Sequence, residues 1–182
     1  MALENSQIID ACVLINLLAT EEIDGILNAT LRKSLICSAV EKEAIYLRTD
    51  DPENPQELIQ TSSFVRSGLL TICELESAEE KALYVDYASV LDDGEAMTLA
   101  ISVSRGWVLV TDERKARKLF LEDVGDPARL VGTSELIREW SKSEGTSPKV
   151  IARVLAAIER RARYRPPDTD LNFDWWITSI TE

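Results

Sequence analysis

Short apolar runs that alternate with helical segments are the feature that most limits how this chain can fold. The runs cover residues 7–10, 35–38, 69–73, 107–111 and 128–131. The helical segments between them include residues 13–19, 77–91, 95–105 and 113–121. A continuous apolar run of this length is typical of a strand that is covered on both faces. Because parallel strands need crossover connections, the alternation predicts a mostly parallel sheet with helices on both faces.

Two further segments have features of helices. Val40, Ala44 and Leu47 recur at the i, i+4 and i+7 positions of an amphipathic helix. A second segment starts at Pro55 and ends at Gly68, and helices often begin with proline and end with glycine. We therefore expect helices over residues 40–47 and 55–68.

The composition excludes some classes of protein. Of the 182 residues, 45% are hydrophobic and 29% are charged, which is sufficient for one sizeable core. The formal net charge of −12 argues against a uniformly basic surface that coats nucleic acid. The first five residues carry no basic leader, and the apolar stretch at 11–19 is too short to cross a bilayer. We expect a soluble cytoplasmic protein with no membrane partner, in which Cys12, Cys37 and Cys73 form no disulfide framework.

Four acidic residues lie where a strand passes into a helix or near the start of that helix: Asp10, Glu43, Glu95 and Asp112. In an open parallel sheet, ligands bind outside the carboxyl ends of the strands. The chain has no histidine, so a hydrolase built from it would lack the commonest general base. Clustered carboxylates repel one another unless a cation neutralises them, and oxygen ligands favour Mg²⁺ or Mn²⁺ over zinc. The pattern therefore predicts a divalent metal site made by these four residues.

Helix capping is an alternative explanation for these acids. Asp10 and Asp112 each precede a predicted helix, where aspartate is a favoured N-cap. Asp92 and Glu95 have the spacing of a capping box, in which Glu95 would bond to the backbone of Asp92. Glu43 lies on the apolar side of its expected helix, where a buried carboxylate needs a partner or a cation. The alternative for Glu43 is that it reaches solvent at the edge of that apolar stripe.

The order and spacing of the acids resemble those of the PIN-domain nuclease family over about residues 7–132. The matching segments are Ile8-Ile9-Asp10, Glu43 after the Ile36-Cys37-Ser38 strand, Gly94-Glu95-Ala96, and Val110-Thr111-Asp112. The resemblance implies a three-layer α/β/α sandwich with a mostly parallel central sheet. It places a nuclease domain at residues 1–132 and leaves residues 133–182 as a C-terminal helical extension with an acidic aromatic tail.

The resemblance also implies an activity. The chain would be a metal-dependent endoribonuclease of the kind found in VapC-type toxins, with Asp10, Glu43, Glu95 and Asp112 as catalytic and metal-binding residues. Its cofactor would be Mg²⁺ or Mn²⁺, and hydrolysis by water would leave a 5′-phosphate and a 3′-hydroxyl. Cys12 departs from the family, which usually has Ser, Thr or Asn at that place. The expected partners are the RNA substrate, an antitoxin protein and a second copy of the chain in a homodimer.

Cations near the last acid are candidates for holding the phosphate backbone. Arg114, Lys115 and Arg117 follow Asp112 closely, and together with Thr111 they are predicted to contact nucleic acid. The alternative is that this run is a solvated helix face. Farther on, residues 149–165 combine helical spacing with several arginines, and this stretch could bind RNA, pair with a partner helix or pack against the acidic core. The aromatic tail after it is expected to dock on its own core or on another chain.

Other functions are open on the sequence alone. Phosphatases of the haloacid dehalogenase type also place aspartates at strand ends, but they need a second aspartate two residues after the first, where this chain has Cys12. A catalytically inactive PIN-like module that binds nucleic acid or protein is another alternative, and a metal titration would separate it from an enzyme. DNA could replace RNA as the substrate, because none of these residues reads a 2′-hydroxyl.

Overall fold

The computed structural model describes residues 5–143 and 145–181, which form two compact units of discontinuous segments. Unit 1 contains residues 5–13, 31–43 and 61–132. Unit 2 contains residues 14–30, 44–60, 133–143 and 145–181. The prediction that the first five residues carry no basic leader falls mostly on residues outside the described part, since only Asn5 of the five is described. The division of the chain into 1–132 and 133–182 stays a prediction.

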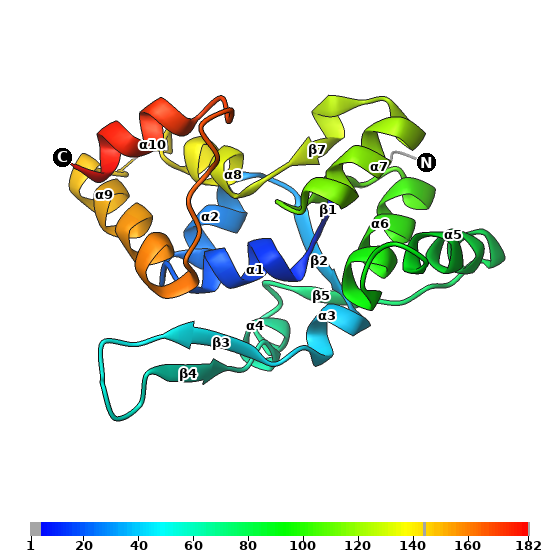
Figure 1. The fold of residues 1–182 in the computed structure, drawn as a ribbon, viewed down its shortest axis with the longest axis horizontal. Coiled ribbons are helices and arrows are strands. Elements are labelled where there is room, and N and C mark those ends of the chain that lie inside the picture. Colours follow the sequence, from blue (N-terminus) through cyan, green and yellow to red (C-terminus); the bar gives the residue numbers. More distant parts are fainter. Residues whose placement is uncertain (1–4, 144, 182) are drawn as a thin grey trace. The chain divides into compact units, whose positions relative to one another are not determined.

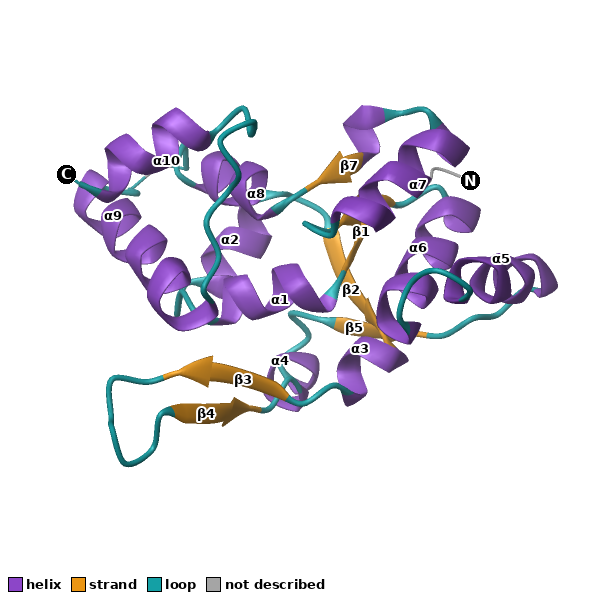
Figure 2. Ribbon diagram, viewed as in Figure 1, coloured by secondary structure: helices purple, strands orange, loops and turns teal. Residues whose placement is uncertain are grey.

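A five-stranded sheet in which every paired strand is parallel is the centre of unit 1 (Figure 2). Its strands are β1 (Ser6–Ile9), β2 (Lys33–Cys37), β5 (Thr71–Cys73), β6 (Val108–Val110) and β7 (Leu130–Val131). The strand order is β5-β2-β1-β6-β7, and Ile8 of β1 pairs with Leu35 on one side and Leu109 on the other. Because β1 and β6 are parallel neighbours, the residues that follow them lie at the same edge of the sheet.

Helices flank this sheet. They are α3 (Ser38–Lys42), α4 (Ser62–Arg66), α5 (Ala78–Ala88), α6 (Asp93–Arg105) and α7 (Arg114–Val124), with the 3-10 turn η1 (Pro127–Arg129). Helix α6 contacts β1, β2 and β6 through fully buried residues such as Leu99, and α5 lies beside it (Figure 1). The left-handed backbone of Gly106 (φ 70°) ends α6 without strain, as predicted. The flanked parallel sheet confirms the predicted α/β/α class.

Unit 2 is mainly helical. It contains most of α1 (Ala11–Leu18), together with α2 (Ile23–Ala29), α8 (Thr133–Trp140), α9 (Pro148–Ala157), the π-helix η2 (Ile158–Ala162) and α10 (Phe173–Ile180). The sequence analysis did not predict α2. Trp176 of α10 is fully buried, donates a hydrogen bond from Nε1 to Glu159 (2.9 Å) and meets the ring of Tyr164 edge-on. The aromatic tail therefore docks on its own chain, which was one of the two expected outcomes.

The predicted helices over residues 40–47 and 55–68 are largely wrong. Helix α3 ends at Lys42, and an antiparallel hairpin of β3 (Ile45–Arg48) and β4 (Gln56–Ile59) follows in unit 2. Ile45 and Leu47 are buried while their neighbours on β3 are exposed, which is the two-residue alternation of a strand. Leu47 fits that alternation as well as it fits the i+7 position of a helix. Only α4 remains of the second predicted helix, and Gly68 follows it with a positive φ of 81°.

Four of the five arginines of residues 149–165 form ion pairs with acids of unit 2. The pairs are Arg153–Glu22, Arg160–Asp50, Arg161–Glu57 and Arg165–Glu159. Arg161 is the most enclosed of these four arginines, with a side chain 15% exposed that also donates to the carbonyl of Ala19 (2.9 Å). These contacts support packing against acidic parts of the same chain, among the three alternatives that the sequence left open.

The three cysteines are all free in the structure. Cys37 and Cys73 are buried and Cys12 is half-buried. Within the described ranges, no helix is both long and apolar enough to span a bilayer.

Candidate active site

Asp10 lies at the carboxyl end of β1, directly before α1, and its side chain is buried (2% exposed). Its Oδ2 accepts hydrogen bonds from the Thr111 hydroxyl (2.7 Å) and the Cys12 thiol (3.3 Å). Its backbone N–H donates to the carbonyl of Val110 (2.9 Å), so the pairing of β1 with β6 places Asp10 beside Thr111. Burial raises the pKa of Asp10, and these donors oppose that rise.

Cys12 stands where the family usually has a hydroxyl or amide side chain. Its Sγ accepts a hydrogen bond from the backbone N–H of Asp112 (3.4 Å) and lies 3.5 Å from the Thr111 hydroxyl. Burial, followed by the charge of Asp10, raises the pKa of the Cys12 thiol, which keeps it protonated. A neutral thiol therefore links Asp10 to the start of the segment that carries Asp112.

Asp112 is half-buried and follows β6 after Thr111. It is not the N-cap of α7, because Glu113 holds that position and accepts the N–H of Lys115 (3.3 Å). Helix capping therefore does not explain Asp112, whereas it does explain Glu113.

Glu95 and Asp92 form the capping box that their spacing predicted. Asp92 Oδ1 accepts the N–H of Glu95 (2.8 Å), and Glu95 Oε2 accepts the N–H of Asp92 (3.4 Å). Partial burial and the charge of Asp92 raise the pKa of Glu95 to about 7, with smaller contributions from Asp10 and Glu113. Capping and a site role are compatible, because each carboxylate has lone pairs beyond the one that the cap uses.

Glu43 follows α3 as its C-terminal cap, with extended backbone (ψ 138°), and it is exposed. The prediction that it lies on a buried helix stripe is wrong, because the helix ends before it. Its side chain nevertheless reaches the start of α6: a Cβ at Gly94 would collide with Glu43 Oε1. Partial loss of hydration, together with the charges of Asp92 and Asp10, raises the pKa of Glu43.

Asp92 links these acids electrostatically. Its charge contributes to the raised pKa of Asp10, of Glu43 and of Glu95. Sequence analysis treated Asp92 only as a helix cap. The signal that could have identified it is the acid-rich turn formed by residues 92–95 at the start of a buried helix.

In the described part of the chain, no three His, Cys, Asp or Glu side chains are arranged to hold one metal ion. The chemistry of the donors still suits a hard divalent cation, since they are carboxylate oxygens whose mutual repulsion a cation would relieve. Gly94 also leaves the space into which the Glu43 carboxylate projects. The residues fit Mg²⁺ or Mn²⁺ by donor type, while their side chains do not form a closed cage.

The predicted nucleic-acid contacts differ in their surroundings. Thr111 is fully buried, and Arg117 donates to its carbonyl (2.8 Å). Lys115 is exposed, with its ammonium group bonded to the carbonyl of Val90, and Arg114 is exposed. The arginine and lysine side chains of α7 therefore lie on a largely exposed helix face that starts beside the acids.

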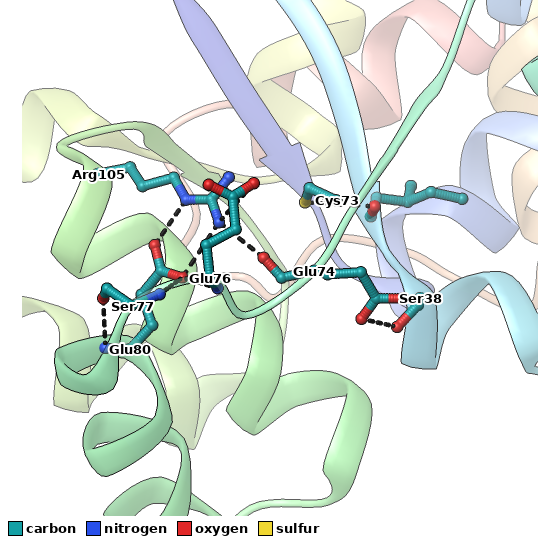
Figure 3. A network of polar contacts seen from close by, with 8 residues as sticks. Ser38, Cys73, Glu74, Glu76, Ser77, Glu80 and Arg105 are labelled. Carbon is teal, nitrogen blue, oxygen red and sulfur yellow. Dashed lines mark hydrogen bonds and ion pairs between the residues drawn. The ribbon is translucent and has the colours of Figure 1, made fainter.

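Arg105, which ends α6, is held in a polar network (Figure 3). It donates from Nε to Glu80 (2.7 Å) and from Nη2 to the carbonyl of Glu74 (2.7 Å). The Glu74 carboxylate in turn accepts the hydroxyl of Ser38 (2.6 Å), the first residue of α3. This network ties the start of α3, the helix before Glu43, to the segment that follows β5.

Together, the parallel sheet and the carboxylates near its carboxyl edge define an α/β protein with an acidic candidate site. A family model described as a PIN domain matches residues 6–164, and the chain therefore belongs to the PIN-domain family. PIN domains are generally nucleases, which act on nucleic acids and typically use divalent metals. Searches of curated proteins and of solved structures returned no match to the chain.

Proposed function

We propose that this protein is a metal-dependent endoribonuclease, in which Asp10, Glu43, Glu95 and Asp112 hold Mg²⁺ or Mn²⁺ and hydrolyse phosphodiester bonds of RNA. The observation that carries the proposal is the parallel pairing of β1 with β6, after which Asp10 and Asp112 follow, in a chain of the PIN-domain family. The charge of Asp92, which raises the pKa of Asp10, Glu43 and Glu95, supports it. When bound, a divalent ion would activate the attacking water and stabilise the charge that develops on the phosphate.

Within this proposal each residue has a distinct role. Asp10 and Asp112 are the direct ligands, since they follow the neighbouring strands β1 and β6. Glu43 and Glu95 bind a second ion or position water. To share one metal ion with Asp10, both side chains would have to turn toward Asp10. Thr111 acts as a positioning residue for Asp10 in place of the predicted nucleic-acid contact, because its buried hydroxyl is used by that carboxylate.

Basic side chains of α7 are the proposed contacts to the phosphate backbone of the RNA. Arg114 and Lys115 are exposed beside the acids and would hold the phosphate backbone, while Arg117 is partly engaged by the Thr111 carbonyl. A toxin role with an antitoxin partner and a homodimer are parts of the same proposal, and they rest on the resemblance alone. A cytoplasmic location is also part of the proposal and rests on the composition of the chain.

A catalytically inactive PIN-like binding module is the second candidate. It is favoured by the lack of a closed metal cage among the described side chains. Such a module does not require a divalent ion. The two candidates therefore differ in whether a divalent metal ion makes the protein cleave RNA.

Cleavage of a mixed RNA pool in Mg²⁺ or Mn²⁺ tests the proposal. We expect the wild-type protein to cut, and we expect Asp10→Asn and Asp112→Asn each to lower the rate by at least about 100-fold, as loss of an essential acid–base or ligand group typically does. Asp86→Asn removes an exposed carboxylate on α5 and serves as the charge-matched control, with a rate like that of wild type. Cutting that survives both site substitutions, or that ignores chelation, overturns the assignment.

A further inference from the structure

An open pocket borders the acids within unit 1, and we call it the Tyr84 pocket. It has a volume of about 700 Å³ and is lined by residues of α3, α5 and α6 and of the segments next to them. Its lining residues include Lys42, Glu43, Tyr84, Asp92, Asp93 and Met97. Small-molecule sites typically have volumes of about 300–1,000 Å³, so a nucleoside fits this space.

Tyr84 and Met97 supply the apolar surfaces of the pocket. The Tyr84 hydroxyl donates to Asp93 Oδ1 (3.0 Å), and this bond fixes the half-buried ring against the start of α6. Met97 lies one turn into α6, with its sulfur 4.0 Å from the Ser38 hydroxyl. An aromatic ring and a thioether both favour contact with the flat face of a base.

The polar groups of the pocket are mostly acceptors. Glu43, Asp92 and Asp93 contribute carboxylates, and Lys42 is the one cation among the described lining residues. Such a lining repels a phosphate, whereas it attracts N–H donors, as carboxylates do when they accept from the amino group of cytosine. Adenine, cytosine and guanine each carry an amino group, which offers two N–H donors, whereas uracil offers only its single imide N–H to such acceptors.

We propose that the Tyr84 pocket binds one unpaired nucleobase that carries an amino group, next to the phosphate that is cut, and that uracil is disfavoured there. The face of the base stacks on Tyr84, and its amino edge donates to Asp92 and Asp93, which leaves Glu43 to the proposed metal. A base inside a duplex cannot present both its face and that edge, so the substrate is single-stranded at this position. The position next to the cut rests on the proposed nuclease function, while binding of the base does not require cutting.

Binding of four labelled oligoribonucleotides tests the pocket. Each is UUUXUUU with X as A, C, G or U, and fluorescence anisotropy measures its affinity for the full-length Asp10→Asn protein in Mg²⁺. Well-placed hydrogen bonds to a base edge discriminate between bases by about 1–3 kcal/mol, so we expect A, C and G to bind at least about fivefold more tightly than U. The ring holds the base so that its amino group reaches the carboxylates, so adding Tyr84→Ala should remove this preference, whereas Tyr84→Phe, which keeps the ring, should retain it.

Val85→Ala is the matched control, because Val85 is the next residue on α5 and is 66% exposed. If Tyr84→Ala does not melt cooperatively, Tyr84→Leu replaces it, since leucine keeps apolar bulk without a ring. Equal affinities for the four oligonucleotides, an unchanged preference without the ring, or no binding at all overturns the inference.

The wild-type protein is assayed for RNA cutting in parallel. A base preference without cutting supports the pocket and overturns the proposed function. Cutting together with equal affinities for the four bases overturns the pocket and leaves the proposed function in place.

Discussion

At the scale of single residues, Asp10 shows how opposing effects set the state of one carboxylate. Burial raises the pKa of Asp10, while hydrogen bonds from Thr111 and Cys12 lower it. The Cys12 thiol therefore donates a hydrogen bond to Asp10, as a hydroxyl at that position would. The charged form that a metal ligand requires is stabilised by these two donors and by the backbone N–H of Ala11, which donates to Asp10 Oδ1 (2.8 Å).

Thr111→Val removes the stronger of the two donors without changing the side-chain shape much. The pKa of Asp10 should then rise further, because its charged form loses a hydrogen bond. We expect Mn²⁺ affinity at pH 7 to fall by about 10–100-fold, as is typical when a ligand loses its hydrogen-bonding partner. The acid limb of the cleavage pH profile should move to higher pH. Thr111→Ser keeps the hydroxyl and serves as the control, and an unchanged Mn²⁺ affinity in Thr111→Val contradicts the role given to Thr111.

Glu95 should make stability depend on pH in the absence of divalent ions. Its pKa in the folded protein is about 7, compared with an ordinary value of 4.5. The folded state holds this proton more tightly than the unfolded state, so the stabilising contribution is present below about pH 4.5 and is lost as the pH rises through about 7.

Glu95→Gln should therefore be more stable than wild type at pH 8 in chelator and equal to it near pH 4. We expect a difference of about 1 kcal/mol or less at pH 8, because the side chain is only partly buried and solvent screens its charge. Urea unfolding at the two pH values measures the effect, and Glu79→Gln, at an exposed position on α5, is the control. No gain in stability at pH 8 would contradict the coupling of Glu95 to the other acids.

At the scale of elements, the Arg105–Glu80 pair joins the end of α6 to the start of α5. The Glu80 side chain is 4% exposed and that of Arg105 is 17% exposed. The hydrogen bond from Arg105 lowers the pKa of Glu80, so the pair stabilises the fold above the ordinary carboxyl pKa, and this contribution is lost as the pH falls through the lowered value.

Arg105→Met leaves Glu80 buried without its cation. Removing one partner of a buried pair typically costs about 3–5 kcal/mol, so we expect the free energy of unfolding at pH 7 to fall by about 3 kcal/mol. The loss should be smaller at pH 4, where Glu80 can take up a proton. Lys118→Met breaks the exposed pair with Glu122 and should cost no more than about 1 kcal/mol. Similar losses in the two variants, measured by urea unfolding, would show that the network is not structural.

The elements also show what can be predicted from the sequence. The segments at 7–10 and 107–111 are correctly predicted as strands, because both faces of the central sheet are covered and each segment has an apolar centre, Ile8-Ile9 and Val108-Leu109-Val110. The β3–β4 hairpin is missed because it buries only one face, and its apolar residues also fit a helical spacing. Local patterns cannot separate these two outcomes when long-range pairing decides between them.

At the scale of the whole molecule, the family match extends to residue 164 and so includes α8, α9 and η2, beyond the predicted boundary at 132. Asp10 and Asp112 could be predicted as site residues because each follows a predicted strand. The sheet order makes those strands, β1 and β6, neighbours. Asp92 was overlooked because a capping box explains it locally, and only the fold places its charge near Asp10 and Glu43.

Mn²⁺ binding tests the central claim most directly, since it requires no knowledge of the RNA target. Calorimetric titration of the full-length protein at pH 8 should give saturable binding of one or two ions. In Asp10→Asn the affinity should be at least about tenfold weaker, as even loss of a residue that supports a ligand weakens metal binding by that factor, and Asp86→Asn should bind like wild type. No saturable binding by the wild-type protein, or equal binding by Asp10→Asn, would contradict the claim that folding gathers these acids around a divalent ion.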